Sequence, residues 1–318
     1  MCMTSIAAPP PEYRAITEAC GLLDGSARGK LALTGGDAKT FLQGQVTNDV
    51  ESLVPGSGCY AAFLTPKGKM LGDLRILDAG DELLLDTERI ALQGLFNMIR
   101  RYSIGYDLKL HKRTLECGLL SLVGPDAALV AGLPDLEDAP EHTHILTTIG
   151  GVGARAIRTD LGVDLLCDAS QAEALRAVLE RAGAVPVSEA TTECLRIERG
   201  RPRYGVDLDD TVIPQEAGLN ERAVSFAKGC YVGQETVARL HYRGKPNRHL
   251  RGLKLSAPAA TGDELRLGDR VVGHLGSVTA SPRQGPIGLA LVRREAAVGS
   301  TLAVGDGGSA EVVELPFH

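Results

Sequence analysis

The spacing of apolar residues predicts amphipathic helices in several parts of the chain. Between Pro11 and Leu23 apolar side chains recur on one helical face, until a turn-forming Asp-Gly pair ends the pattern. The segments 89–102 and 171–182 repeat apolar positions with the same period. Two more helices are expected where Asp37 and Ser188 can cap a first turn. Helices are therefore predicted at 11–23, 89–102, 171–182, 189–199 and directly after Asp37.

Short apolar runs between these segments predict antiparallel strands. Two runs, 58–65 and 70–77, flank the turn-rich Pro66-Lys-Gly-Lys69 and predict a hairpin. Gly151-Val-Gly153 imitates a dinucleotide-binding fingerprint, but strand-like segments follow it instead of a helix that would offer its N-terminus to a pyrophosphate. A glycine hairpin is the better prediction there. Strands set against helices predict the α+β class, with further strands at 30–34, 82–86, 117–123, 156–159 and 162–166.

The character of the chain changes after Pro246. No aromatic residue lies between Tyr242 and Phe317, and short strand-like runs are separated by Gly, Pro and Asp. Evenly spaced short strands with such punctuation are typical of a small antiparallel barrel. We therefore expect a core domain over 1–245, built from two interleaved subdomains, and a β-barrel over 246–318.

The composition indicates an ordinary soluble protein, with 44% apolar and 23% charged residues. No run approaches the roughly 20 apolar residues that a membrane-spanning helix needs, and the first residues lack the features of a leader, so a cytoplasmic location is expected. The seven cysteines are scattered without a Cys-x-x-Cys pair, which predicts reduced thiols and neither a metal site nor a resident iron–sulfur cluster. His142 and His144 lack a third ligand in view and are expected to be solvated loop residues.

One cysteine has a neighbourhood suited to reactivity. Cys230 lies in Lys228-Gly-Cys-Tyr-Val-Gly-Gln-Glu235, between two glycines and two residues after a lysine that can favour the thiolate. From Arg222 to Lys254 there are eight Lys or Arg residues and a single acid, Glu235, although the net charge of the chain is −6. Such a basic stretch predicts an anionic partner near the thiol. The alternative is that Cys230 is a small buried core residue.

The same eight residues resemble the signature of the YgfZ family, folate-binding proteins related to the aminomethyltransferase (T-protein) of the glycine cleavage system and active in iron–sulfur protein maintenance. Further matches lie upstream in the same order, and the resemblance spans about residues 20 to 255. They are Val46-Thr-Asn48-Asp49-Val50, Leu195-Arg-Ile-Glu198-Arg-Gly200, Arg203-Tyr-Gly205-x-Asp207 and Pro214-Gln-Glu216. The resemblance implies a T-protein-like folate-binding core, with helices against antiparallel sheets, followed by the barrel.

The resemblance also implies a site for tetrahydrofolate or another folate derivative. Glu198 is at a position that resembles the pterin-binding glutamate of T-proteins, where one carboxylate accepts two hydrogen bonds from the pterin; the alternative is a surface partner for an arginine. Tyr60 is expected either to stack on the ligand or to pack in the core. Arg203, Arg222 and Arg239 are candidates for binding the carboxylates of the folate tail, and the sequence does not rank them.

For the chemistry, the resemblance implies that Cys230 supplies the thiol, assisted by Lys228 and positioned by Gln234 and Glu235. One segment departs from T-proteins, whose loop after the second strand resembles Gly-Gly-x-x-Asp-Asp-Leu with an essential first aspartate. Here Gly68-Lys-Met-Leu-Gly72-Asp73-Leu74 has glycine at that position. Loss of the carboxylate predicts aminomethyl transfer weaker by on the order of 10²-fold or more and leaves a structural role for the remaining acid.

The leading hypothesis is a tetrahydrofolate-binding accessory factor for the assembly or repair of iron–sulfur clusters in client enzymes, including tRNA-modifying ones. Its expected partners are folate and iron–sulfur client proteins, without direct nucleic-acid binding or a membrane. Two alternatives stay open. One is a folate-dependent aminomethyltransferase, and the other is an RNA-binding module that uses the basic stretch 222–254, with binding that weakens steeply with salt.

Overall fold

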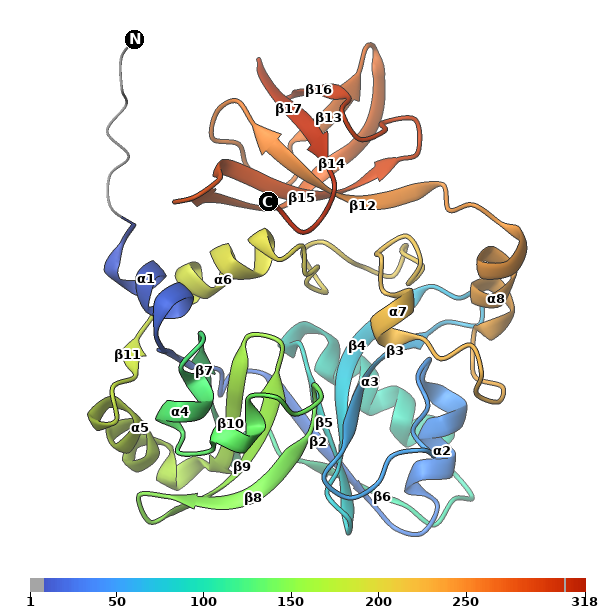
Figure 1. Ribbon diagram of the computed structural model, residues 1–318. Coiled ribbons are helices and arrows are strands. Elements are labelled where there is room, and N and C mark those ends of the chain that lie inside the picture. Colours follow the sequence, from blue (N-terminus) through green and yellow to red (C-terminus); the bar gives the residue numbers. More distant parts are fainter. Residues whose placement is uncertain (1–8, 306) are drawn as a thin grey trace.

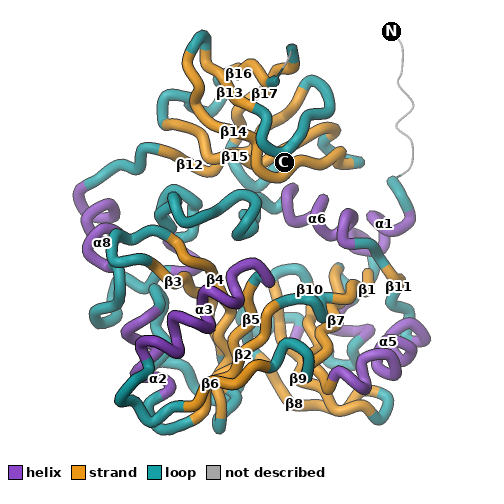
Figure 2. The backbone as a smooth tube through the Cα atoms, turned by 180° about the vertical axis from the view of Figure 1, so that it is seen from behind, coloured by secondary structure: helices purple, strands orange, loops and turns teal. Residues whose placement is uncertain are grey.

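The computed structural model describes residues 9–305 and 307–318. Two open sheets lie side by side, and a closed barrel lies above them (Figure 1). Seen from behind, α6 (Glu189–Glu198) and the loop after it lie between the sheets and the barrel (Figure 2). This layer joins the three parts of the molecule.

The first sheet has five antiparallel strands in the order β3-β4-β5-β2-β6. Its outer face packs on α2 (Ala38–Gln45) and α3 (Arg89–Tyr102), with Phe41, Phe63 and Leu95 fully buried between them. The apolar side chains of its strands alternate, so that one face is hydrophobic and the other carries charges. The strands are β2 (Gly29–Thr34), β3 (Gly58–Leu64), β4 (Met70–Asp78), β5 (Glu82–Thr87) and β6 (Lys109–Lys112).

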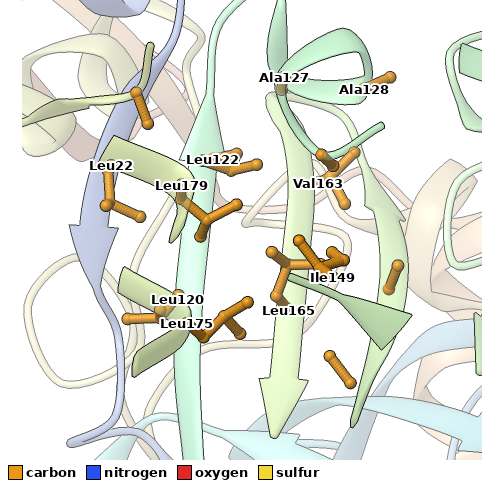
Figure 3. Close-up of a cluster of buried hydrophobic side chains, with 14 of the residues drawn as sticks. Leu22, Leu120, Leu122, Ala127, Ala128, Ile149, Val163, Leu165, Leu175 and Leu179 are labelled. Atoms are coloured by element: carbon orange, nitrogen blue, oxygen red, sulfur yellow. The ribbon is translucent and has the colours of Figure 1, made fainter. Parts of the chain in front are cut away.

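The second sheet has six strands in the order β11-β1-β7-β10-β9-β8, and its one parallel pair is β1 with β11. Leucines of β7 and β10 pack against α4 (Ala127–Val130) and α5 (Ala172–Arg181) (Figure 3). The strands are β1 (Gly21–Asp24), β7 (Cys117–Val123), β8 (His144–Ile149), β9 (Val152–Thr159), β10 (Gly162–Asp168) and β11 (Val185–Pro186), with 3-10 turns at Pro134–Leu136 and Ala169–Gln171.

The barrel closes in the order β12-β15-β14-β13-β16-β17. Two short helical segments, α7 (Asn220–Ala223) and α8 (Gln234–Arg243), lie between α6 and the barrel in sequence. Leucine and valine side chains fill the barrel interior. Its strands are β12 (Arg248–Leu255), β13 (Glu264–Leu267), β14 (Arg270–Ser281), β15 (Gly285–Arg293), β16 (Thr301–Val304) and β17 (Gly308–Val313).

The two sheets turn their charged faces toward each other. A small apolar cluster, Ala32, Leu77 and Leu84 of the first sheet with Ile157 of the second, packs where the sheets meet. Ionic and polar side chains occupy the neighbouring positions on the same faces. We call this region the inter-sheet face.

Several predicted elements are confirmed, including helix 89–102, the β3–β4 hairpin and the glycine hairpin between β8 and β9. The first helix, α1 (Pro11–Glu18), is shorter than predicted, because the backbone leaves the helical conformation at Ala19 (φ −146°) and continues from Gly21 as β1. Asp37 and Ser188 occupy N-cap positions without capping bonds. Their side chains instead bond the backbone of Asp107 and the carboxylate of Glu12.

The prediction that His142 and His144 are solvated is wrong. His144 begins β8 and is buried, while His142 is mostly buried beside the first sheet. Of the helices in the described part of the chain, none combines the length and the apolar character needed to cross a membrane.

Candidate functional site

Strand alternation places Tyr60 of β3 and Asp73 of β4 on the inter-sheet face. The Tyr60 hydroxyl donates a hydrogen bond of 2.5 Å to Oδ2 of Asp73. Asp73 is buried, and this burial raises the pKa of its carboxyl to about 6, although the hydrogen bond from Tyr60 acts in the opposite direction. Burial and the neighbouring carboxylate raise the pKa of the Tyr60 hydroxyl as well. The pair is therefore able to hold a proton near neutral pH.

Gly72 points to the opposite face of β4. A Cβ at this position would lie 3.0 Å from Cβ of Ala91 and 3.3 Å from Leu95, inside the apolar layer beneath α3. A carboxylate at 72 would thus face hydrocarbon, and the carboxylate that faces the site is Asp73. The expectation that the glycine removes the acid from the site does not fit this geometry, because Asp73 supplies a carboxylate there. A structural role for Asp73 stays a prediction.

A ladder of ion pairs crosses the inter-sheet face. Arg75 of β4 reaches Asp86 of β5 at 2.9 Å and Asp164 of β10 at 2.8 Å, so that it links the two sheets. Arg28 pairs with the same Asp86 and with Glu88. The two arginines keep the pKa of Asp86 below its usual value despite burial. None of these residues was predicted, because single charges on separate strands give no sequence signal until the strands are aligned.

Arg222 lies over Tyr60. Its guanidinium carbon is 5.4 Å from the centre of the ring, within the range of a cation–π contact. The same guanidinium pairs with Glu141 at 2.6 Å and approaches Asp160 at 3.7 Å. The Asn48 amide donates to the backbone oxygens of Tyr60 and Arg222, at 2.8 and 3.3 Å, and so fixes both. The structure thus brings together two of the predicted ligand-binding residues.

Glu198, the predicted pterin carboxylate, is occupied by protein groups. The hydroxyl of Tyr13 donates to both of its oxygens, at 2.8 and 2.9 Å, and the hydroxyl of Ser281 donates to Oε1. These partners come from α1 and from β14 of the barrel. The buried carboxylate therefore joins three elements, and the alternative of a solvated surface residue is wrong.

Lys228 does not lie against the thiol as a free cation. Its ammonium donates to three backbone oxygens at and just after the end of α2, those of Gln43, Val46 and Asn48, each at 2.7 Å. All three protons are thereby used. Burial lowers the pKa of this lysine to about 8. The predicted assistance to the thiolate is not what the contacts provide, because they make Lys228 the anchor of the loop.

The rest of the signature presents Cys230 to solvent. Cys230 is exposed, while Tyr231 is buried in the cluster beneath. Gly233 has φ +83°, and a Cβ there would lie 2.5 Å from the Thr65 oxygen, so this position requires glycine. The alternative of a buried structural cysteine is excluded.

The remaining predicted site residues form ion pairs or begin a helix, and none of them is hydrogen-bonded to Tyr60 or Asp73. Gln234 and Glu235 begin α8, where Glu235 pairs with Arg239 on the exposed side of the helix. Arg203 pairs with Glu88, Glu189 and Glu193.

Three of the eight Lys and Arg residues in the basic stretch 222–254 pair with carboxylates that lie elsewhere in the sequence. Arg248 pairs with Glu216 and Arg251 with Glu314, in addition to the pair between Arg222 and Glu141. The stretch therefore does not form the continuous free basic surface that the sequence suggested.

A cavity of about 380 Å³ opens where α1, α6 and the barrel meet the second sheet. Its wall contains Glu198 and Asp160, and Asp160 pairs with Arg201 at 2.9 Å as well as approaching Arg222. Cys230 is not among its lining residues. Within residues 9–305 and 307–318 no group of three or more His, Cys, Asp or Glu is arranged to hold a metal ion. The six cysteines in that range are all free thiols.

Comparison with known proteins agrees with this architecture. Residues 6–228 match the model of the GCVT N-terminal domain, and residues 248–318 match that of the glycine cleavage T-protein C-terminal barrel domain. A chloroplastic putative transferase of Arabidopsis thaliana is 31% identical, over 93% of this chain and 71% of its own length. An aminomethyltransferase of Rubrobacter xylanophilus is 30% identical, over 96% of this chain and 85% of its own.

A solved structure has the same fold. The glycine cleavage system aminomethyltransferase T of Bartonella henselae matches with a TM-score of 0.85 at 24% identity, over 96% of this chain and 88% of its own. The predicted fold class, helices against antiparallel sheets followed by a small barrel, is confirmed. Since one family model alone matches more than half of the sequence, the chain belongs to the glycine cleavage T-protein family.

Proposed function

We propose that this protein is a YgfZ-like member of the T-protein family, a tetrahydrofolate-binding accessory factor for assembly or repair of iron–sulfur clusters in client enzymes. The observation that carries the proposal is the exposed thiol of Cys230. The residues around Cys230 fix the conformation of the loop that carries it: Lys228 is hydrogen-bonded to the end of α2, and Gly233 packs against the β3–β4 turn. A loop built to present one thiol suits a protein that acts on partners.

The inter-sheet face supplies groups that fit a reduced pterin. A pterin has a ring N–H beside an exocyclic amine, and one carboxylate can accept both hydrogen bonds. Asp160 is the better candidate for this role than Glu198, because both oxygens of Glu198 accept from Tyr13 or Ser281, whereas the arginine contacts of Asp160 all reach Oδ2 and leave Oδ1 open. Tyr60 supplies an aromatic surface, and Arg222 a cation for a carboxylate of the ligand. When bound, the folate would supply the carrier of a one-carbon group.

Titration of tetrahydrofolate against three proteins tests this placement. Wild type should bind it, Asp160→Asn should bind at least ~10-fold more weakly through loss of a charge-assisted pair, and Glu198→Gln should stay close to wild type. Equal affinities of wild type and Asp160→Asn would remove Asp160 from the site.

The thiol is tested in cells that lack the gene. Wild type should restore the activity of an iron–sulfur-dependent tRNA-modifying enzyme, and Cys230→Ser should not. The control variant is Cys117→Ser, which removes a partly buried thiol at the start of β7; this variant should restore activity as wild type does. Full restoration by Cys230→Ser would contradict the proposed role. We prefer protein partners in the cytoplasm to RNA, because Arg222, Arg248 and Arg251 of the basic stretch are paired with carboxylates.

A second function, folate-dependent one-carbon transfer, is favoured by one observation. Asp73 faces the site, accepts a hydrogen bond from the Tyr60 hydroxyl, and has a pKa raised to about 6, which suits a group that gives or takes a proton near neutral pH. The test is formation of methylenetetrahydrofolate from an aminomethyl donor, and Asp73→Asn should reduce that rate on the order of 10²-fold. No product with the wild type would exclude this function.

A further inference from the structure

The side chain of Arg222 covers the ring of Tyr60 on the inter-sheet face. The Arg222 guanidinium lies over the ring of Tyr60, and the carboxylate of Glu141 holds it there at 2.6 Å. Neither partner is fully exposed, since their side chains are 26% and 33% accessible. A planar ligand that stacks on this face of Tyr60 must move the guanidinium. Arg222 is therefore both a candidate ligand-binding residue and an obstacle in the closed arrangement.

The segment that carries Glu141 is held in an unfavourable conformation. His142 has φ +72°, and it is the one non-glycine residue with positive φ among those that the structure describes. A residue with a Cβ adopts this backbone region rarely. The Nδ1 atom of His142 is buried and has no hydrogen-bond partner among the described residues. We call the state in which Glu141 holds Arg222 over Tyr60 the closed arrangement. Both features of His142 disfavour this state and make displacement of the segment easier.

Two backbone hydrogen bonds join the segment 140–143 to Arg158 of β9. The His142 amide donates to the Arg158 oxygen at 2.8 Å, and the Arg158 amide donates to the Thr143 oxygen at 2.8 Å. A third bond, from the Thr143 amide to the Pro140 oxygen at 3.0 Å, lies within the segment. When Glu141 leaves, Arg222 keeps a second carboxylate nearby, Asp160 at 3.7 Å. The guanidinium would not be left as an unpaired charge, which removes the main cost of opening.

We propose that the Glu141–Arg222 pair is a latch: Glu141 holds the guanidinium over the ring of Tyr60, and segment 140–143 must release Arg222 before the ligand can use the Tyr60 face. The inference rests on the proposed folate site. Apparent affinity is reduced by the fraction of molecules that are closed, so weakening the latch should strengthen binding. For a partly exposed ion pair, the expected change is about three- to fivefold.

Two measurements on Glu141→Gln test the latch. Hydrogen exchange of the His142 and Thr143 amides, without ligand, should be about three- to fivefold faster than in wild type if the open state becomes more populated. The dissociation constant for tetrahydrofolate should fall by a similar factor. The matched control is Asp138→Asn, which removes the same charge from an exposed residue of the same loop and should change neither value.

The outcomes separate the latch from the folate proposal. Faster exchange and tighter binding in Glu141→Gln alone would support the latch. Unchanged exchange and unchanged affinity, with wild type still binding tetrahydrofolate, would overturn the latch and leave the folate proposal intact. If no variant binds tetrahydrofolate, the folate proposal fails, and the exchange measurement still decides whether Glu141 holds the segment closed.

Discussion

Replacing Asp73 by asparagine should change the pH dependence of stability in a defined direction. The pKa of this buried carboxyl is raised to about 6 from an ordinary 3.8, chiefly by burial. A group whose folded pKa lies above its unfolded pKa contributes stability that is complete below pH 4 and lost as the pH rises through 6. The gap of roughly two pKa units corresponds to about 3 kcal/mol of stability, of which about half is lost between pH 5 and pH 8.

Asparagine does not titrate, and its carbonyl can still accept the hydrogen bond from Tyr60. Urea unfolding of both proteins at pH 5, 6, 7 and 8 gives their difference in unfolding free energy at each pH. We expect the wild type to lose about 1.5 kcal/mol relative to Asp73→Asn over this range. Asp138→Asn, which lacks burial, should show no such trend. A difference that is constant from pH 5 to pH 8 would refute the reasoning about Asp73.

Three further changes test the structural roles of residues around the site. Glu198→Ala should lower the free energy of unfolding by about 2–4 kcal/mol in urea denaturation, since it leaves the Tyr13 and Ser281 hydroxyls without their partner; a loss below ~0.5 kcal/mol would contradict the role of Glu198 in joining these elements. Lys228→Met should cost about 3 kcal/mol and speed proteolysis of the Cys230 loop, because three backbone oxygens lose their donor; unchanged proteolysis would contradict the anchor. Gly233→Ala should destabilise the protein by roughly 1–3 kcal/mol because alanine disfavours the left-handed backbone there, and by more because its Cβ would meet the Thr65 oxygen; the melting temperature should fall accordingly. Gly229→Ala is the control, since its Cβ would meet open space, and it should leave the melting temperature unchanged.

The sequence predicts local structure well where one pattern dominates. The β3–β4 hairpin and helix 89–102 follow from apolar periodicity and turn residues, and both are present. The predicted end of the first helix is wrong because the apolar pattern continues through Cys20 into β1, while the backbone leaves the helix at Ala19. The spacing of apolar residues does not show where the backbone changes conformation.

The site is harder to predict, because its residues meet only across two sheets. Tyr60 and Arg222 were expected near a ligand and do lie together, yet Glu141 and Asp160, which complete the group, lie in a loop and a turn without any distinctive motif. The position of a residue in a motif does not show what it contacts. Glu198 and Lys228 stand where a ligand carboxylate and a thiol-activating cation are expected, and both are hydrogen-bonded to groups of the protein itself. Which face of β4 holds Asp73 was decided by strand alternation.

A crystal structure of the protein soaked with tetrahydrofolate would show whether folate binds at the charged face between the two sheets. We expect the pterin ring against Tyr60, with Asp160 bonded to its ring N–H and amine and Arg222 moved away from Glu141. Ligand density confined to the part of the cavity at Glu198, with Arg222 still over the ring of Tyr60, would rule out a folate site at the inter-sheet face.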